Sequence, residues 1–300
     1  MFADSTEFTG NHTFRYLWPH RVNRMNWRGI KRWVKSFAWM QKEESADVLR
    51  YFRDTNHYYP MSETQPQDIF VAGFPKSGNT WMQHMLSALQ FGMDPRYAPD
   101  KLVQELTPDV HLKPFYKRYH DFCFFKTHDL PLPHMKRVVH LVRDGRDAMA
   151  SFGAMKRDLG SGFTLEGMIL RGDGLINEPW YEHCRQWIEN PHGAEILLVR
   201  YEDLLEDTTR ELHRICDFAG LGRNQEEIQR VVDGSSFGAM QKKEQESGWD
   251  NPRWKNLKTF VRQGKTGSYR DEIPPDLLSH FEREAAPYLK HFGYLVEVKN

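Results

Sequence analysis

Cysteine is scarce in this chain of 300 residues, which has only three. Cys123, Cys184 and Cys216 form no CxxC pair and have no paired histidines nearby, so the sequence predicts neither a structural zinc site nor a disulfide framework. This cysteine usage is typical of a protein kept in a reducing cytoplasm.

Long apolar runs and net charge are also absent. No stretch approaches the roughly 18 consecutive apolar residues of a membrane span, and the N-terminus lacks the apolar core of a signal peptide. Lys plus Arg total 41 and Asp plus Glu total 41, so no global field draws the chain toward nucleic acid. We expect a cytoplasmic protein without a nucleic-acid partner or stable membrane association, in which any anion site is local.

Acidic residues are missing between residues 11 and 41, where basic and aromatic residues alternate. Apolar residues recur there at helical spacing: Trp27, Ile30, Val34 and Phe37. We expect residues 1–60 to form a helical extension with a basic face packed on the main domain, residues 61–300. A membrane-surface or substrate-lid role is the alternative for this extension.

Strands and helices alternate through the main domain. Strands are expected at 68–73, 122–126, 137–142 and 195–199, and helices at 80–91, 146–156, 179–189 and 208–219. Thr208 and Glu211 are expected to form a capping box, and Pro274 to open the last helix. The alternation predicts an α/β fold with a central parallel sheet flanked by helices on both faces.

The most specific segment is the turn GFPKSGNTW, which joins the first strand to the first helix at residues 73–81. Backbone N–H groups of such a turn, together with a helix N-terminus, form a concave anion site. Lys76 adds a mobile charge, and Ser77, Asn79 and Thr80 add neutral donors. The turn is not a Walker A motif, because Lys76 precedes Gly78.

A second signal stands at the end of the next strand, in the run Lys126-Thr127-His128. The strand period of two places Lys126 and His128 on the same side, at the sheet edge where open α/β folds bind ligands. A histidine there can take a proton at neutral pH, and a lysine can stabilise charge. By itself, a strand-end histidine can also be a structural polar residue.

Five segments together resemble the PAPS-dependent sulfotransferases of cytosolic type. GFPKSGNTW resembles the family's 5′-phosphosulfate loop and KTHDLP (126–131) its catalytic strand. VVHLVRDGRDAMAS (138–151), EILLVRYEDLL (195–205) and FVRQGKTG (260–267) resemble its later donor-binding segments. The likeness spans residues 69–293 in the family's order.

The resemblance implies a P-loop kinase-like sulfotransferase fold and transfer of a sulfuryl group from 3′-phosphoadenylyl sulfate (PAPS), which leaves adenosine 3′,5′-bisphosphate (PAP). It implies His128 as the general base, with Lys76 and Lys126 stabilising the transferring group and no metal. Donor contacts are implied for Lys76, Ser77, Gly78, Asn79, Thr80, Trp81, Arg143, Ser151, Tyr201, Ser235, Phe237, Arg262, Gln263 and Gly264. Arg143 suits a phosphate because guanidinium binds it bidentately.

The acceptor is expected to be a small molecule with a hydroxyl or amine, as in a bacterial enzyme that tailors natural products. The segment from Met155 to Trp180 is expected to form a flexible lid over it. Acidic residues in and near this segment suggest a polar or cationic acceptor, with plain surface acids as the alternative: Asp129, Asp158, Glu166 and Asp173. The protein is expected to be a monomer or homodimer.

Two other functions remain open on the sequence. A nucleotide or metabolite kinase-like phosphoryl transferase is disfavoured because Lys76 is misplaced for Walker A. A non-catalytic nucleotide-binding module would leave Lys126 and His128 without a role. Two positions depart from the family pattern: Asp129 replaces an apolar residue, and Gln263 replaces a lysine.

Overall fold

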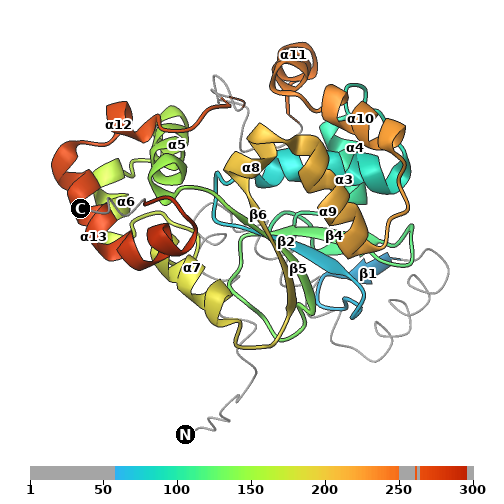
Figure 1. Ribbon diagram of the computed structural model, residues 1–300, viewed down its shortest axis with the longest axis horizontal. Coiled ribbons are helices and arrows are strands. Elements are labelled where there is room, and N and C mark those ends of the chain that lie inside the picture. Colours follow the sequence, from blue (N-terminus) through green and yellow to red (C-terminus); the bar gives the residue numbers. More distant parts are fainter. Residues whose placement is uncertain (1–57, 250–260, 262–263, 296–300) are drawn as a thin grey trace, which may run out of the picture. The chain divides into compact units, whose positions relative to one another are not determined.

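A four-stranded parallel sheet forms the centre of the compact unit that spans Tyr58–Asn300. The computed structural model describes residues 58–249, 261 and 264–295 (Figure 1). The strands are β2 (Ile69–Ala72), β4 (Phe124–Thr127), β5 (Arg137–Val142) and β6 (Glu195–Arg200), in the order β4-β2-β5-β6. A separate antiparallel pair joins β1 (Tyr58–Pro60) to β3 (Phe115–Lys117). The helix predicted in residues 1–60 lies outside the described residues.

The four predicted strands are confirmed with small shifts in their bounds. Ala72, the last residue of β2, pairs with Thr127 of β4 and with His140 of β5. Since the strands are parallel, the segments that follow β2, β4, β5 and β6 all leave from the same edge of the sheet. This edge is where the sequence placed its candidate functional residues.

Helices lie to both sides of the sheet (Figure 1). One side carries α3 (Asn79–Phe91), α4 (Asp100–Leu106), α8 (Tyr201–Glu206), α9 (Thr208–Ala219), α10 (Gln225–Gly234) and α11 (Phe237–Ser247). The other carries α5 (Gly145–Asp158), α6 (Leu165–Arg171), α7 (Trp180–Glu189), α12 (Tyr269–Glu272) and α13 (Pro275–His291). Ile69 and Val71 pack into the core below α3, whereas Phe70 belongs to the core on the opposite face. The predicted α/β architecture is confirmed.

The start of α9 corrects one expectation. The capping residue is Asp207, whose side chain accepts from the backbone N–H of Arg210 at 2.9 Å. Thr208 instead donates its hydroxyl to the carbonyl of Leu204 at 2.6 Å, because it is already inside the helical turn. The predicted Thr208–Glu211 capping box is therefore wrong.

The three cysteines are free and buried. Burial raises the pKa of Cys123 to about 12 and that of Cys216 to about 11, so these thiols stay protonated. Within residues 58–249, 261 and 264–295, no cluster of His, Cys, Asp and Glu is arranged to hold a metal ion. None of the helices described there has the length and apolarity to span a membrane.

Replacing Gly145 with Ala is expected to destabilise the fold by about 1 to 3 kcal/mol, because the site has no room for a methyl group. A Cβ on Gly145 would stand 2.4 Å from the ring of Trp180 and 2.8 Å from that of Phe281, and both rings are buried. Thermal denaturation measures the effect. Gly222→Ala is the control, since a Cβ there would meet nothing within 4 Å. Equal melting temperatures for the two variants would contradict this packing.

Candidate active site

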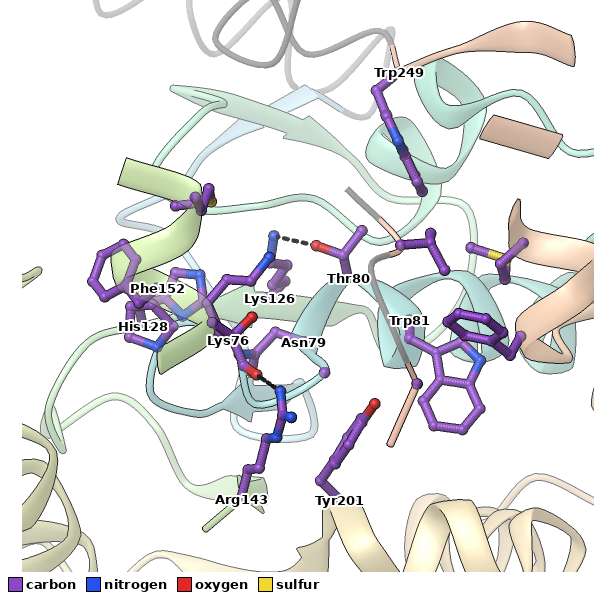
Figure 2. A pocket seen from close by; sticks show the side chains of 18 of the residues that line it. Lys76, Asn79, Thr80, Trp81, Lys126, His128, Arg143, Phe152, Tyr201 and Trp249 are labelled. Atoms are coloured by element: carbon purple, nitrogen blue, oxygen red, sulfur yellow. Dashed lines mark hydrogen bonds between the residues drawn. The ribbon is translucent and has the colours of Figure 1, made fainter. Parts of the chain in front are cut away.

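A cavity of about 560 Å³ opens at the edge of the sheet where β2, β4, β5 and β6 end (Figure 2). The residues predicted from sequence that line it are Lys76, Gly78, Asn79, Thr80, Trp81, Lys126, His128, Arg143, Ser151, Tyr201, Phe237 and Gly264. The structure thus brings residues from six segments of the chain into one space.

Two predicted residues take other positions. Ser77 is fully buried beneath the loop and does not line the cavity. Ser235 is buried and its hydroxyl donates to the carbonyl of Val231 at 2.5 Å, so it does not line the cavity, and its contact with a ligand stays a prediction. Ser236 lines the cavity in its place. Arg262 and Gln263 lie outside the described residues.

The loop between β2 and α3 has the conformation of an anion cradle. Lys76 and Gly78 have φ angles of 72° and 96°, and a Cβ on Gly78 would lie 2.8 Å from the ring of Tyr201. The first N–H groups of a helix have no partner within that helix, so those of α3 face the cradle. Within the described part of the chain, the buried hydroxyl of Ser77 has no hydrogen-bond partner. This set of donors fits a phosphate group.

The imidazole of His128 is held in one tautomer by the same loop. Its Nδ1 lies 2.7 Å from the carbonyl oxygen of Gly73. Because a carbonyl only accepts, Nδ1 carries the proton and Nε2 keeps its lone pair. The backbone N–H of His128 donates to Nε2 of His111 at 3.0 Å, and the two rings stack with centroids 5.8 Å apart.

The environment of His128 keeps the ring neutral. Burial and then the charge of Lys126 lower the pKa of His128 to about 3. The imidazole is therefore neutral throughout the physiological pH range and carries a lone pair on Nε2.

Lys126 is a buried cation with two partners. Its ammonium lies 3.0 Å from Oδ2 of Asp109 and 3.3 Å from Oγ1 of Thr80 (Figure 2 draws the second contact). Burial alone would raise the pKa of Asp109, but the net shift is downward, chiefly because of the charge of Lys126. The two groups therefore form a buried ion pair without net charge, whose ammonium lies in the wall of the cavity.

Asp109 and His111 were missed by the sequence analysis. They reach the site because residues 108–110 run beside β4, where Lys126 donates to the carbonyl of Pro108 at 2.9 Å and Val110 donates back at 3.0 Å. The pairing is a single bridge without a hydrophobic period. The spacing of two between Asp109 and His111, matching that of Lys126 and His128, was the available signal.

Arg143 joins two loops at the other end of the cavity. Its guanidinium donates to the carbonyls of Lys76 at 3.0 Å and Lys265 at 3.3 Å, and lies 4.6 Å from the centre of the Tyr201 ring. Two carbonyl contacts leave other N–H groups of a five-donor side chain available, and Nε has no partner among the residues described. Arg143 can therefore receive an anion.

The segment 264–269 is fixed against α5 by Asp147. The carboxylate of Asp147 accepts from the backbone N–H of Gly267 at 2.6 Å and of Tyr269 at 3.0 Å. Gly264 packs directly against the ring of Phe237, since a Cβ on Gly264 would stand 2.3 Å from that ring. This close approach completes the wall beside Arg143.

Aromatic rings from α3, α8 and α11 form a slot across the cavity from His128 (Figure 2). Trp81 and Tyr201 meet edge to face with centroids 6.1 Å apart, and Phe237 lines the same cavity. The indole N–H of Trp81 donates to the carbonyl of Ser235 at 2.7 Å, which fixes its ring. Flat, fixed rings of this kind bind a planar base by stacking.

Protonation of His128 is expected to have a midpoint well below 6.5, the ordinary histidine value, because burial and Lys126 favour its neutral form. The unfolded chain then binds the proton more readily, so folding stability falls as pH drops below about 6.5. An NMR titration measures the midpoint, with His128→Gln assigning the signal. A midpoint at or above 6.5 would contradict the described environment.

The four acidic residues expected near the acceptor do not line the cavity. Asp129 accepts from the hydroxyl of Thr127 at 2.9 Å, and Asp173 pairs with Arg171 at 2.6 Å. Among the residues that the structure describes, the one acid in the lining is Asp109, which Lys126 neutralises. The expected preference for a cationic acceptor gains no support. The predicted lid contains α6 and contributes apolar side chains to the cavity.

Comparisons with known proteins agree with this geometry. The family described as "Sulfotransferase domain" matches residues 66–293. Cytosolic sulfotransferase 1 from Danio rerio is 26% identical over 268 residues, which cover 77% of this chain and 85% of that protein. The 3-beta-hydroxysteroid sulfotransferase of Cavia porcellus is 24% identical over 271 residues, covering 84% of this chain and 91% of that protein.

Solved structures share the fold. Retinol dehydratase in complex with androsterone and the inactive cofactor PAP has a TM-score of 0.57 at 22% identity, over 76% of this chain and 82% of that one. A mouse sulfotransferase complexed with PAP has a TM-score of 0.56 at 18% identity, over 77% and 90% of the two chains.

Proposed function

The chain belongs to the sulfotransferase family, and from that premise we propose that it transfers a sulfuryl group from PAPS to a hydroxyl or amine of a small molecule. One observation carries the proposal. The anion cradle at residues 73–81, the neutral His128 and the arginine at position 143 share a single cavity.

The donor fits the described groups. The loop from Gly73 to Trp81, with Lys76, would hold the 5′-phosphosulfate, because the N–H groups at the start of α3 supply donors. The 3′-phosphate would bind Arg143, Ser151 and Gly264, to which the proposal adds Arg262 and Gln263. Adenine would lie in the slot of Trp81, Tyr201 and Phe237. PAP leaves after transfer.

The catalytic step follows from the position of His128. Its Nε2 accepts the proton of the acceptor as the acceptor's oxygen or nitrogen attacks sulfur. The bond between sulfur and the bridging phosphate oxygen breaks, and its electron pair leaves with PAP. Lys76 and Lys126 stabilise the negative charge that spreads over this group, and they do so as side-chain cations already fixed in the cavity. Because Gly73 begins the cradle and orients His128, donor loop and base are held together.

The acceptor is proposed to be a natural product or related metabolite with an apolar body, sulfated in the cytoplasm. The apolar side chains of Leu112, Phe152, Met155 and Ile176 line the end of the cavity that would receive it. The related proteins are titled for a 3-beta-hydroxysteroid and for retinol, which are alcohols with apolar bodies.

The test is turnover of PAPS with a panel of phenols, alcohols and amines in the presence of a metal chelator. The proposal predicts PAP and sulfated acceptor in a one-to-one ratio. Consumption of ATP with Mg²⁺, and none of PAPS, would replace the proposal with phosphoryl transfer. Binding of PAP without turnover of any acceptor would indicate a nucleotide-binding module.

A further inference from the structure

The second half of α5 forms the wall of the cavity near His128. Phe152, Met155, Lys156 and Leu159 all line the cavity from this helix. In Figure 2, Phe152 lies beside His128, and Trp81 and Tyr201 lie at the opposite end of the view. With the base at this end and the aromatic slot at the other, the wall around Phe152 faces the acceptor and not the nucleotide.

Lys156 is the charged member of this wall, and its half-buried ammonium lies against two aromatic rings. The nitrogen lies 5.1 Å from the centre of the Phe152 ring and 5.1 Å from that of Phe163. No carboxylate in the described part of the chain pairs with it. Burial lowers the pKa of Lys156, which shows that the cation is poorly solvated where it stands.

The remaining charges near this wall do not compensate Lys156. Asp109 is paired with Lys126 at 3.0 Å, and Asp129 is held by the hydroxyl of Thr127. Lys76 and Lys126 serve the transferring group in the proposed reaction. An acceptor that enters therefore meets apolar side chains and one positive charge without a counter-ion.

We propose that Lys156 makes the acceptor site selective for an amphipathic carboxylate: a molecule with a nucleophilic hydroxyl or amine at one end, an apolar body, and a carboxylate at the other. The inference rests on the proposed function. A single ammonium balances one monoanionic carboxylate, whereas a phosphate dianion would leave one negative charge uncompensated against apolar side chains. The rings of Phe152 and Phe163 hold the ammonium in place through cation–π contacts.

The test uses matched phenols that differ in the charge of one group. The probes are 4-hydroxybenzoate, 4-hydroxyphenylacetate and 3-(4-hydroxyphenyl)propionate, the neutral amide of each, and tyramine as the cation. Dissociation constants are measured by calorimetry with the protein saturated with PAP, and kcat/KM is measured with PAPS. The three spacer lengths vary the distance between the phenol, which must reach His128, and the carboxylate, which must reach Lys156.

The best acid is expected to exceed its own amide and tyramine by about tenfold or more in both measurements. Lys156→Met keeps the length and apolar stem of the side chain but removes the charge, so acid and amide are expected to become equal. Lys156→Arg should keep the preference for the acid. Affinity for PAP should be unchanged in both variants, because the donor half of the cavity is intact.

Equal binding of acids, amides and tyramine by the original protein would overturn the inference, as would a preference for the acid that survives in Lys156→Met. If the original protein neither binds PAP nor turns over PAPS, that result contradicts the proposed function and not the role of Lys156. The calorimetric preference for the acid is read separately from turnover, so the two failures are distinguishable.

Discussion

His128→Ala lowers kcat for PAPS-dependent sulfation by at least about 100-fold and leaves the affinity for PAP within about twofold. Removal of a general base typically costs 10² to 10⁴ in rate. The affinity should persist because the imidazole contacts the cradle at the carbonyl of Gly73, whereas the donors proposed for PAP are the N–H groups of α3 and Arg143. Steady-state kinetics and calorimetry on the same preparation measure the two quantities, and retained PAP binding shows that the variant is folded.

His213→Ala is the matched control for this prediction. His213 lies on α9 with its Nε2 2.7 Å from Gln225, and it does not line the cavity. The control should keep full activity. A His128→Ala protein that retains more than a tenth of the original kcat would show that another group takes the proton.

Arg143→Met is expected to weaken PAP binding by about 100-fold, with little change in the affinity for adenosine 5′-phosphate. Truncating one partner of a desolvated charge pair typically costs about 2 to 5 kcal/mol. Only the affinity for PAP should fall, because the proposed partner of Arg143 is the 3′-phosphate, which adenosine 5′-phosphate lacks. Calorimetry with the two nucleotides separates this effect from a general loss.

Arg137→Met serves as the control for Arg143→Met, because the two arginines stand at opposite ends of β5. Arg137 pairs with Glu195 and is remote from the cavity lining. The Arg137→Met variant should bind both nucleotides with the affinities of the original protein. If Arg143→Met lost both nucleotides equally, the role of Arg143 would be to support the loop at Lys76, to whose carbonyl it donates, and the 3′-phosphate assignment would fail.

Sequence reasoning succeeded where local pattern determines structure. The buried strand at β2 and the turn of small residues after it predicted the anion cradle, because these signals lie within a dozen consecutive residues. The spacing of Lys126 and His128 at a strand end predicted that both line the cavity, and they do. Arg143, which follows β5, was instead assigned to a phosphate from the family resemblance, and it lines the same cavity.

The sequence did not show contacts made by irregular segments. Asp109 and His111 reach the site through one bridge to β4, and Lys156 belongs to a correctly predicted helix whose cavity-facing side the sequence did not identify. Ser235 was assigned to the ligand from the family resemblance, but the end of α10 turns its hydroxyl inward. Each of these outcomes depends on tertiary packing and not on local spacing.

Calorimetric titration of the full chain with PAP, with ATP–Mg²⁺ and with adenosine 5′-phosphate tests the central claim that the cavity is a PAPS site. The account predicts micromolar binding of PAP, with the other two nucleotides at least about tenfold weaker. Equal or tighter binding of ATP–Mg²⁺ would contradict the donor assignment of Arg143 and place phosphoryl transfer ahead of sulfuryl transfer.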